Sequence, residues 1–72
     1  MPPVWVANRN IWADPALPYV IERHAELADL MPSGVLERFE VRRWGEILAI
    51  RFSLGEATRY AEERWALLDG RH

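Results

Sequence analysis

The segment Phe39–Gly70, FEVRRWGEILAIRFSLGEATRYAEERWALLDG, constrains the fold more than any other part of this chain. Its first half alternates apolar and polar residues around Gly45, as a β-hairpin does, and its second half has apolar residues at helical spacing. Between the halves, Ser53 and Glu56 have the spacing of a capping box, in which each side chain bonds the other residue's free backbone amide. The segment therefore predicts a β-hairpin that leads directly into a capped amphipathic helix.

The register of this hairpin follows from the positions of its apolar residues, which are odd-numbered in the first strand and even-numbered in the second. If both sets face one core, the numbers of paired residues must add to an odd sum. A two-residue type II′ turn at Gly45 and Glu46, or a loop over residues 44–47, gives a sum of 91. The expected core positions are Phe39, Val41, Leu48, Ile50 and Phe52, and the expected pairs are Phe39 with Phe52, Val41 with Ile50, and Glu40 with Arg51.

The first half of the chain predicts one strand and one helix. After an extended or frayed start over Met1–Pro3, Val4–Ala7 is short and rich in β-formers, and residues 8–14 follow as a loop. Asp14 and Pro15 then have the types preferred at an N-cap and at the first helical position. A stripe at helical spacing comes next, made of Leu17, Val20, Ile21, His24, Leu27, Ala28 and Met31, and Pro32, Ser33 and Gly34 end it. We expect a helix from about Pro15 to about Leu30.

These elements predict a single α+β domain over residues 1–72, in the order β-α-β-β-α. The second helix has an apolar stripe of Ala57, Tyr60, Ala61, Trp65 and Leu68, and Gly70 is placed to close its C-terminus. Both helices are expected on one face of a small antiparallel sheet built on the hairpin, which makes two layers. A core this small favours a dimer, formed either through the apolar stripes or by extension of the sheet across a two-fold axis.

The composition argues against several classes of function. The chain has no cysteine and only two histidines, so we expect no disulfide, no structural metal and no cofactor. A net charge of −2 gives no general attraction to nucleic acid or to anionic lipid. The apolar runs are too short to span a bilayer, and the start MPPVWVANRN lacks the features of a signal peptide. We expect a soluble, cytoplasmic protein that does not bind membranes.

Few residues offer catalytic chemistry. Ser33 lies in a predicted turn, the capping box uses Ser53, and His24 is expected at the edge of the core. Two acidic pairs, Glu22 with Glu26 and Glu62 with Glu63, are expected on hydrated helix surfaces beside arginines. The four glycines are isolated, so the chain has no phosphate-binding loop. We therefore predict that the protein is not an enzyme.

Tryptophan and arginine are the unusual residues, because the chain has four tryptophans and all nine of its basic residues are arginine. Trp65 is expected in the core, Trp5 on either side of its strand, and Trp12 either over the core or against a partner. On the expected register the outward face of the hairpin gathers Arg38, Glu40, Arg42, Trp44, Ala49 and Arg51. Such a face can bind an acidic protein surface or phosphates, or it can be an ordinary solvated sheet face. We predict a partner-binding site at Arg38, Arg42, Trp44 and Arg51, with Trp12.

The segment GEILAIRFS, with RR before it and a helix after it, resembles the hairpin of prevents-host-death type antitoxins. The resemblance rests on Gly45, Ala49 and Ser53 and on the apolar alternation, and it covers about a third of the chain. It implies a domain that dimerises and binds operator DNA.

The sequence thus leaves two hypotheses. The first is a small non-catalytic regulator or inhibitor, of the kind that phages and mobile elements encode, which docks on another protein. The alternative is a dimeric DNA-binding antitoxin or repressor of the prevents-host-death type.

Overall fold

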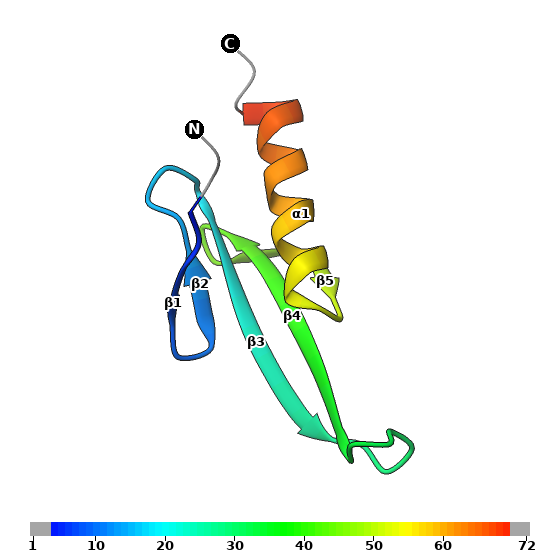
Figure 1. Cartoon of the computed structure of the whole chain (residues 1–72). Helices are drawn as coiled ribbons and strands as arrows, with labels where there is room; N and C mark the ends of the chain where they lie inside the picture. The colour runs from blue at the N-terminus through cyan, green and yellow to red at the C-terminus, as the bar shows by residue number, and fades with distance from the viewer. Residues whose placement is uncertain (1–3, 70–72) are drawn as a thin grey trace.

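Five antiparallel strands and one C-terminal helix form the fold in the computed structural model, which describes residues 4–69 (Figure 1). The strands lie in the sheet in chain order, so each connection between neighbours is a hairpin. The α+β class is confirmed, but the sheet has more strands than predicted and one predicted helix is absent from the described residues. The frayed start expected at Met1–Pro3 and the cap expected at Gly70 lie outside these residues. The elements are β1 (Val6–Asn8), β2 (Ile11–Ala13), β3 (Tyr19–Leu27), β4 (Val35–Arg43), β5 (Glu46–Arg51), α1 (Leu54–Arg64) and the π-helical turn η1 (Trp65–Asp69).

The helix predicted from Pro15 to Leu30 is wrong, because most of that range forms strand β3. Tyr19 and Ile21 are fully buried on one face of β3, whereas the even-numbered residues between Val20 and Glu26 lie on the other face. β3 pairs with β4 over nine residues, from Tyr19 opposite Arg43 to Leu27 opposite Val35. The helical stripe and this period-two alternation overlap in the same window, and pairing with β4 decides between them.

Asp14 closes a turn before β3 and does not cap a helix. Its side chain is buried and accepts hydrogen bonds from the backbone N–H groups of Val4 and of Ala16, the latter at 2.7 Å. Its carbonyl accepts from the backbone N–H of Leu17 at 3.0 Å. Aspartate is favoured in such side-chain-to-backbone turns as well as at N-caps, so its presence at position 14 is compatible with either a turn or a helix start.

The register predicted for β4 and β5 is also wrong. Phe39 lies opposite Arg51, Glu40 opposite Ile50 and Val41 opposite Ala49, and a β-bulge then shifts the pairing so that Arg42 lies opposite Ile47. The turn consists of Trp44 and Gly45, with φ of 52° and 82°, the two positive values that a type I′ turn requires. Leu48 is the extra residue at the bulge and packs against the core. As a result Ile50 and Phe52 are exposed, while Ala49 and Arg51 share the face of Phe39 and Val41.

The core lies between the sheet and α1. The helix begins as predicted, because Ser53 is an extended N-cap whose Oγ accepts a hydrogen bond from the Glu56 backbone N–H at 3.2 Å. Ala57 and Ala61 are fully buried, and their small side chains let the helix approach the sheet closely. The core residues are Tyr19, Ile21, Phe39, Val41, Ala57 and Ala61, with Trp5, Trp12, Leu17, Leu48, Ala49, Leu54, Tyr60 and Trp65 packed around them.

Candidate functional site

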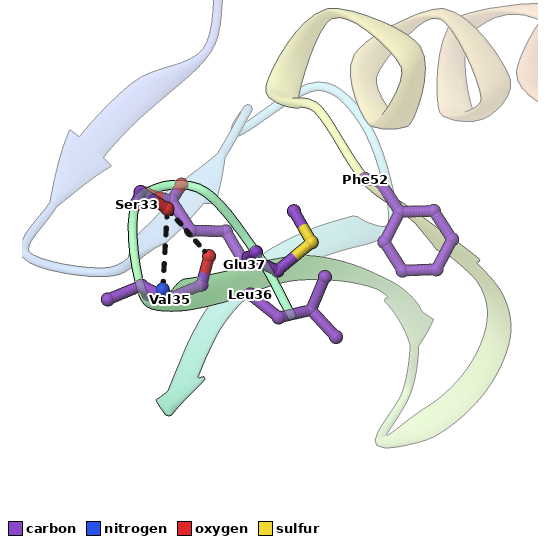
Figure 2. A pocket seen from close by; sticks show the side chains of 6 residues that line it. Ser33, Val35, Leu36, Glu37 and Phe52 are labelled. Atoms are coloured by element: carbon purple, nitrogen blue, oxygen red, sulfur yellow. Dashed lines mark hydrogen bonds between the residues drawn. The ribbon is translucent and has the colours of Figure 1, made fainter. Parts of the chain in front are cut away.

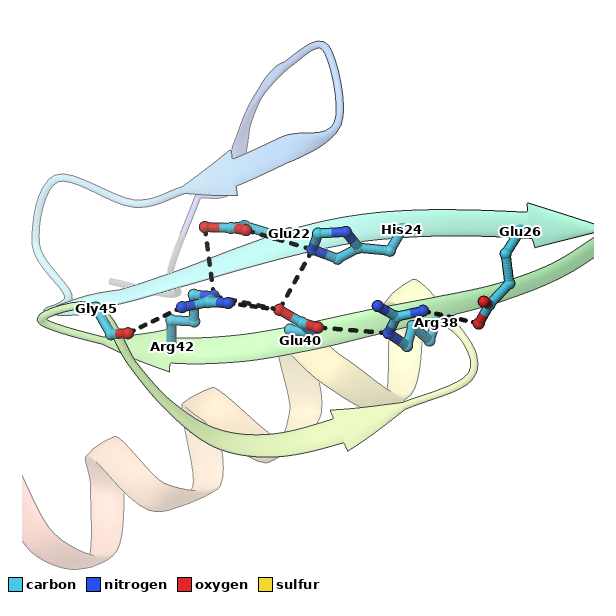
Figure 3. Close-up of polar contacts among 7 residues, drawn as sticks. All are labelled: Glu22, His24, Glu26, Arg38, Glu40, Arg42 and Gly45. Atoms are coloured by element: carbon cyan, nitrogen blue, oxygen red, sulfur yellow. Dashed lines mark hydrogen bonds and ion pairs between the residues drawn. The ribbon is translucent and has the colours of Figure 1, made fainter.

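The side of the sheet opposite α1, here called the open face, carries a dense group of charged side chains (Figure 3). Alternation along β3 and β4 places the even-numbered residues of both strands on this face, and the ladder sets Glu22 opposite Glu40 and His24 opposite Arg38. The six residues of the group are Glu22, His24 and Glu26 from β3 and Arg38, Glu40 and Arg42 from β4, and we call them the ionic network. Two neighbouring strands, and not a helix surface, therefore position every member.

Glu40 is the centre of the ionic network. Its side-chain oxygens accept from Arg42 Nη2 at 2.8 Å, from Arg42 Nε at 3.2 Å and from Arg38 Nε at 3.4 Å. Only 5% of Glu40 is exposed, although no second layer of structure covers it, because the flanking side chains themselves shield the carboxylate. The hydrogen bonds from Arg42 are the main cause that lowers the pKa of Glu40 below its ordinary value; burial raises it, and His24 and Arg38 lower it further.

The two arginines are neutralised within the chain. Arg38 Nη1 lies 2.8 Å from Glu26 Oε1, and Arg42 Nε lies 3.5 Å from Glu22 Oε2. Arg42 also donates from Nη1 to the carbonyl oxygen of Gly45 at 2.9 Å, which ties the network to the β4–β5 turn. Each guanidinium thus has carboxylate partners on both sides, and the open face is not a free positive patch.

His24 lies between two carboxylates. Its Nε2 is buried and lies 3.3 Å from Glu40 Oε1 and 3.4 Å from Glu22 Oε1. These three residues place potential metal-ligand atoms within 4.8 Å of one another. Because Arg38 and Arg42 already pair with these carboxylates and their charges oppose a cation, we assign the cluster to the ionic network and not to a metal centre.

Exposed apolar side chains flank the ionic network on both sides of the open face. Ile50 pairs with Glu40 and Ile47 pairs with Arg42, and these two isoleucines are 42% and 44% exposed. On the β2 side, Ile11 pairs with Glu22 and is 45% exposed. Val6 of β1 is also exposed and lies on this face, because Val6 pairs with Ala13 and Ala13 pairs with Val20. The open face is therefore a charged strip with exposed apolar side chains on both sides of it.

The structure separates the residues predicted to form one site. Arg38 and Arg42 do share the open face, but the bulge places Arg51 on the helix side, where its guanidinium lies 4.8 Å from the Tyr60 ring centroid. Trp12 also lies on the helix side, with its ring 5.8 Å from that of Phe39, so it covers the core. Trp44 stands in the turn, 81% exposed, with the Arg43 guanidinium 4.4 Å from its ring centroid.

Sequence reasoning missed the β3 half of the ionic network and the apolar margins. Glu22 and Glu26 looked like a hydrated helix surface, and Ile50 looked like core. The available signal was the alternation of charged residues at 22, 24 and 26, which is typical of one strand face. The charges at 38, 40 and 42 also alternate, with the opposite order of signs to those at 22, 24 and 26.

The hydroxyl groups considered for catalysis have local partners. Ser33 Oγ donates to the Val35 carbonyl oxygen at 3.0 Å and accepts from the Val35 backbone N–H at 3.3 Å. Ser53 caps α1. Both serines hold backbone in place, and neither forms a hydrogen bond with a histidine among those resolved for residues 4–69.

Comparisons with protein-family models, with curated proteins and with solved structures give no match to this chain. Within the described residues, no helix has the length and apolar character needed to cross a membrane.

The ionic network predicts a specific pH dependence of stability. Because the pKa of Glu40 is lowered in the folded state, its stabilising contribution is present above the unfolded pKa of about 4.5 and is lost as the pH falls through the folded pKa. The free energy of unfolding, measured with urea between about pH 6 and pH 3, should therefore fall less steeply in Glu40→Gln than in the unmodified protein. The pKa of Glu37 is lowered by Arg23 in both proteins, so it cancels in this comparison. Equal pH slopes would contradict the role given to Glu40.

Proposed function

We propose that this protein is a small non-catalytic regulator or inhibitor that docks on a partner protein through the open face of its sheet. One observation carries the proposal: an internally neutralised ionic network lies between exposed apolar margins on a face that no helix of residues 4–69 covers. The docking residues are Arg38 and Arg42, as the sequence predicted, together with Ile47, Ile50 and Ile11. Arg51 and Trp12 are left out because they lie on the helix side.

The ionic network supports docking because its side chains are already ordered. Arg42 is held by Glu40, Glu22 and the Gly45 carbonyl, so binding need not immobilise a free side chain. Arg38 and Arg42 remain 31% and 27% exposed, and each has donor groups at the surface beyond those bonded within the chain. A complementary partner would therefore present acceptor groups opposite the arginines and apolar groups opposite the isoleucines.

The apolar margins supply the burial that drives association. Ile47 and Ile50 lie on the same face, opposite Arg42 and Glu40 of the ionic network, and each offers a β-branched side chain that loses little entropy when buried. Trp44 stands at the adjoining turn, to which Arg42 is hydrogen-bonded, so a partner that extends past the network can also meet this exposed indole. The open face thus combines apolar area with fixed polar groups.

The alternative proposal, a DNA-binding antitoxin or repressor, would use the same arginines to contact phosphates. Arg38 and Arg42 lie 2.8 Å from Glu26 and Glu40 respectively, so phosphates would have to compete with these carboxylates. The carboxylates of the network would also repel the phosphate backbone. These contacts favour a protein as the partner.

A salt series separates the two proposals. Affinity capture from the native cell, with the full chain as bait and mass spectrometry as readout, should retain a protein when the salt of the wash rises from about 50 to about 500 mM, since apolar burial is insensitive to salt. Binding of generic duplex DNA should be weak even at the low end of this range. Tight DNA binding with a steep log-linear salt dependence would instead support the DNA-binding alternative and contradict docking.

A further inference from the structure

The distal half of the β3–β4 hairpin forms a two-stranded arm that extends beyond the rest of the sheet (Figure 1). β2 pairs with β3 only as far as Glu22, and β5 pairs with β4 only from Phe39 onward. Residues 24–27 and 35–38 therefore pair with each other and, within residues 4–69, with no third strand. We call these two strands and the loop 28–34 that joins them the arm. Isolated two-stranded ribbons are marginally stable in water, so the arm lacks structural support.

One edge of the arm is a vacant strand position. β5 ends opposite Phe39, after which the chain turns away at Phe52 to begin α1, and the β4 edge over Val35–Arg38 is left open. Figure 2 shows the pocket of about 500 Å³ beside this edge, with Phe52 across it from Ser33 and Val35. Backbone groups on such an edge template the addition of another strand, which here displaces the Ser33 hydroxyl from the Val35 N–H and C=O.

Exposed apolar side chains concentrate around this edge and the tip of the arm. Leu27 is 88% exposed, Leu30 99% and Phe52 64%. Met31 and Leu36 line the pocket together with Phe52. A group of exposed apolar side chains next to an open strand edge has the features of an interaction site.

We propose that the arm pairs with the arm of a second copy of this chain, β4 edge against β4 edge, about a two-fold axis perpendicular to the sheet. This pairing is antiparallel and uses the same residues from both copies, so the vacant position is self-complementary. The charges of the arm are already balanced, because Arg38 pairs with Glu26 at 2.8 Å and Arg23 pairs with Glu37 at 3.0 Å. A second copy therefore meets no net repulsion, whereas a strongly charged partner would gain no attraction.

Charge also selects the register of the pairing. A two-fold axis perpendicular to the sheet keeps each face on its own side, so the numbers of opposed residues must add to an even sum. A sum of 74 would place Glu37 directly against Glu37 of the other copy, which like charges disfavour. A sum of 72 places Leu36 against Leu36 and Val35 against Glu37. A sum of 70 would set Leu36 against Gly34 and pair less of the edge Val35–Arg38, so the register of 72, with Leu36 on the two-fold axis, uses the edge best.

This register also accounts for the exposed residues at the tip. The second copy's β4 comes into line with the end of β5, so its 28–34 loop meets Phe52 and the start of α1. A stable interface takes about 800 Å² from each partner, which is about 15% of the 5281 Å² exposed by this chain. Four edge residues supply only part of that area, and contact between Phe52 and the tip residues Leu30 and Met31 supplies more. The two open faces then lie side by side on one continuous sheet.

Sedimentation of the full chain tests the pairing. The unmodified protein should sediment as a dimer of twice 8.4 kDa, and Leu36→Glu should raise the dimer dissociation constant by at least about 30-fold, the effect of losing a central interface residue. Circular dichroism should show an unchanged fold, because Leu36 lies outside the core. The matched control Leu67→Glu changes an exposed leucine of η1 and should leave the dimer intact. A monomer at about 1 mM unmodified protein, or a dimer that Leu36→Glu does not weaken, would overturn the pairing.

Disulfide crosslinking of an introduced cysteine tests the pairing without weakening the dimer. The chain has no native cysteine, so Leu36→Cys introduces one thiol per copy. On the two-fold axis the two thiols should form an interchain disulfide on mild oxidation, because directly opposed residues in a sheet have Cα atoms within disulfide range. Leu67→Cys should not crosslink. Crosslinking at position 67 and not at position 36 would show that the dimer forms through η1 and would overturn the proposed pairing of the arms.

Discussion

Replacing Ile21 by alanine is expected to lower the free energy of unfolding by about 3 kcal/mol, as measured by urea denaturation. Ile21 is fully buried in the core between the sheet and α1, and its truncation leaves a cavity beside its ladder partner Val41. A domain of 72 residues has a total stability of roughly 4 to 11 kcal/mol, so this single change removes a large share of it. Leu27→Ala, in contrast, should change the stability by less than about 0.5 kcal/mol, because Leu27 is 88% exposed on the arm.

This pair of substitutions distinguishes a strand from a helix at residues 19–27. On a helix, Ile21 and Leu27 would share one apolar stripe and both would be buried. In β3 they lie on the same face but at different distances from α1, which covers only the proximal part of the strand. Equal losses of stability for the two variants would contradict β3 and favour the helix.

The C-terminal part of the fold could be predicted because it depends on local signals. Ser53 begins α1 as a cap, and Ala57 and Ala61 recur one turn apart on its buried side. Capping and helical periodicity act over a few residues, so one sequence window contains all the information. The hairpin over β4 and β5 was located correctly for the same reason, since Gly45 marks its turn.

The N-terminal part could not be predicted because its structure depends on a distant partner. Residues 17–31 contain both a helical stripe and a charge alternation, and only the β3–β4 ladder selects the second. The alternating residues Glu22, His24 and Glu26 contact Arg42, Glu40 and Arg38, respectively, diagonally across that ladder. Local propensity is weaker than such non-local pairing.

The candidate site changed because of one bulge. The predicted register requires an uninterrupted ladder, but Leu48 is inserted between the pairs Arg42–Ile47 and Val41–Ala49. One extra residue moves all later side chains of β5 to the other face, which brings Ile50 to the open face and takes Arg51 away from it. The turn that imposes this register places Trp44 at positive φ. Non-glycine residues rarely adopt this conformation, so the sequence does not predict it.

The combined substitution of Ile47 and Ile50 by threonine is expected to weaken partner binding by at least about 30-fold, or roughly 2 kcal/mol. Threonine keeps the β-branched shape that strand β5 favours, so the variant removes apolar area without disturbing the ladder. Both isoleucines are more than two-fifths exposed in the free protein, so the cost to stability should be less than about 1 kcal/mol.

The arginines of the open face make poorer probes. Arg42→Ala would remove two hydrogen bonds from the shielded Glu40 carboxylate, together with the bond to Gly45. A loss of binding in that variant would therefore mix a lost contact with a rearranged ionic network. The apolar margins report on docking alone.

Calorimetric titration of the captured partner with three proteins tests whether the open face is the docking surface. These are the unmodified chain, the variant that combines Ile47→Thr and Ile50→Thr, and the control Leu67→Thr, which changes an equally apolar exposed residue on η1. The open-face variant should bind at least about 30-fold more weakly while the control binds within about 2-fold of the unmodified chain. Unchanged affinity of the open-face variant would show that the partner docks elsewhere and would contradict the account.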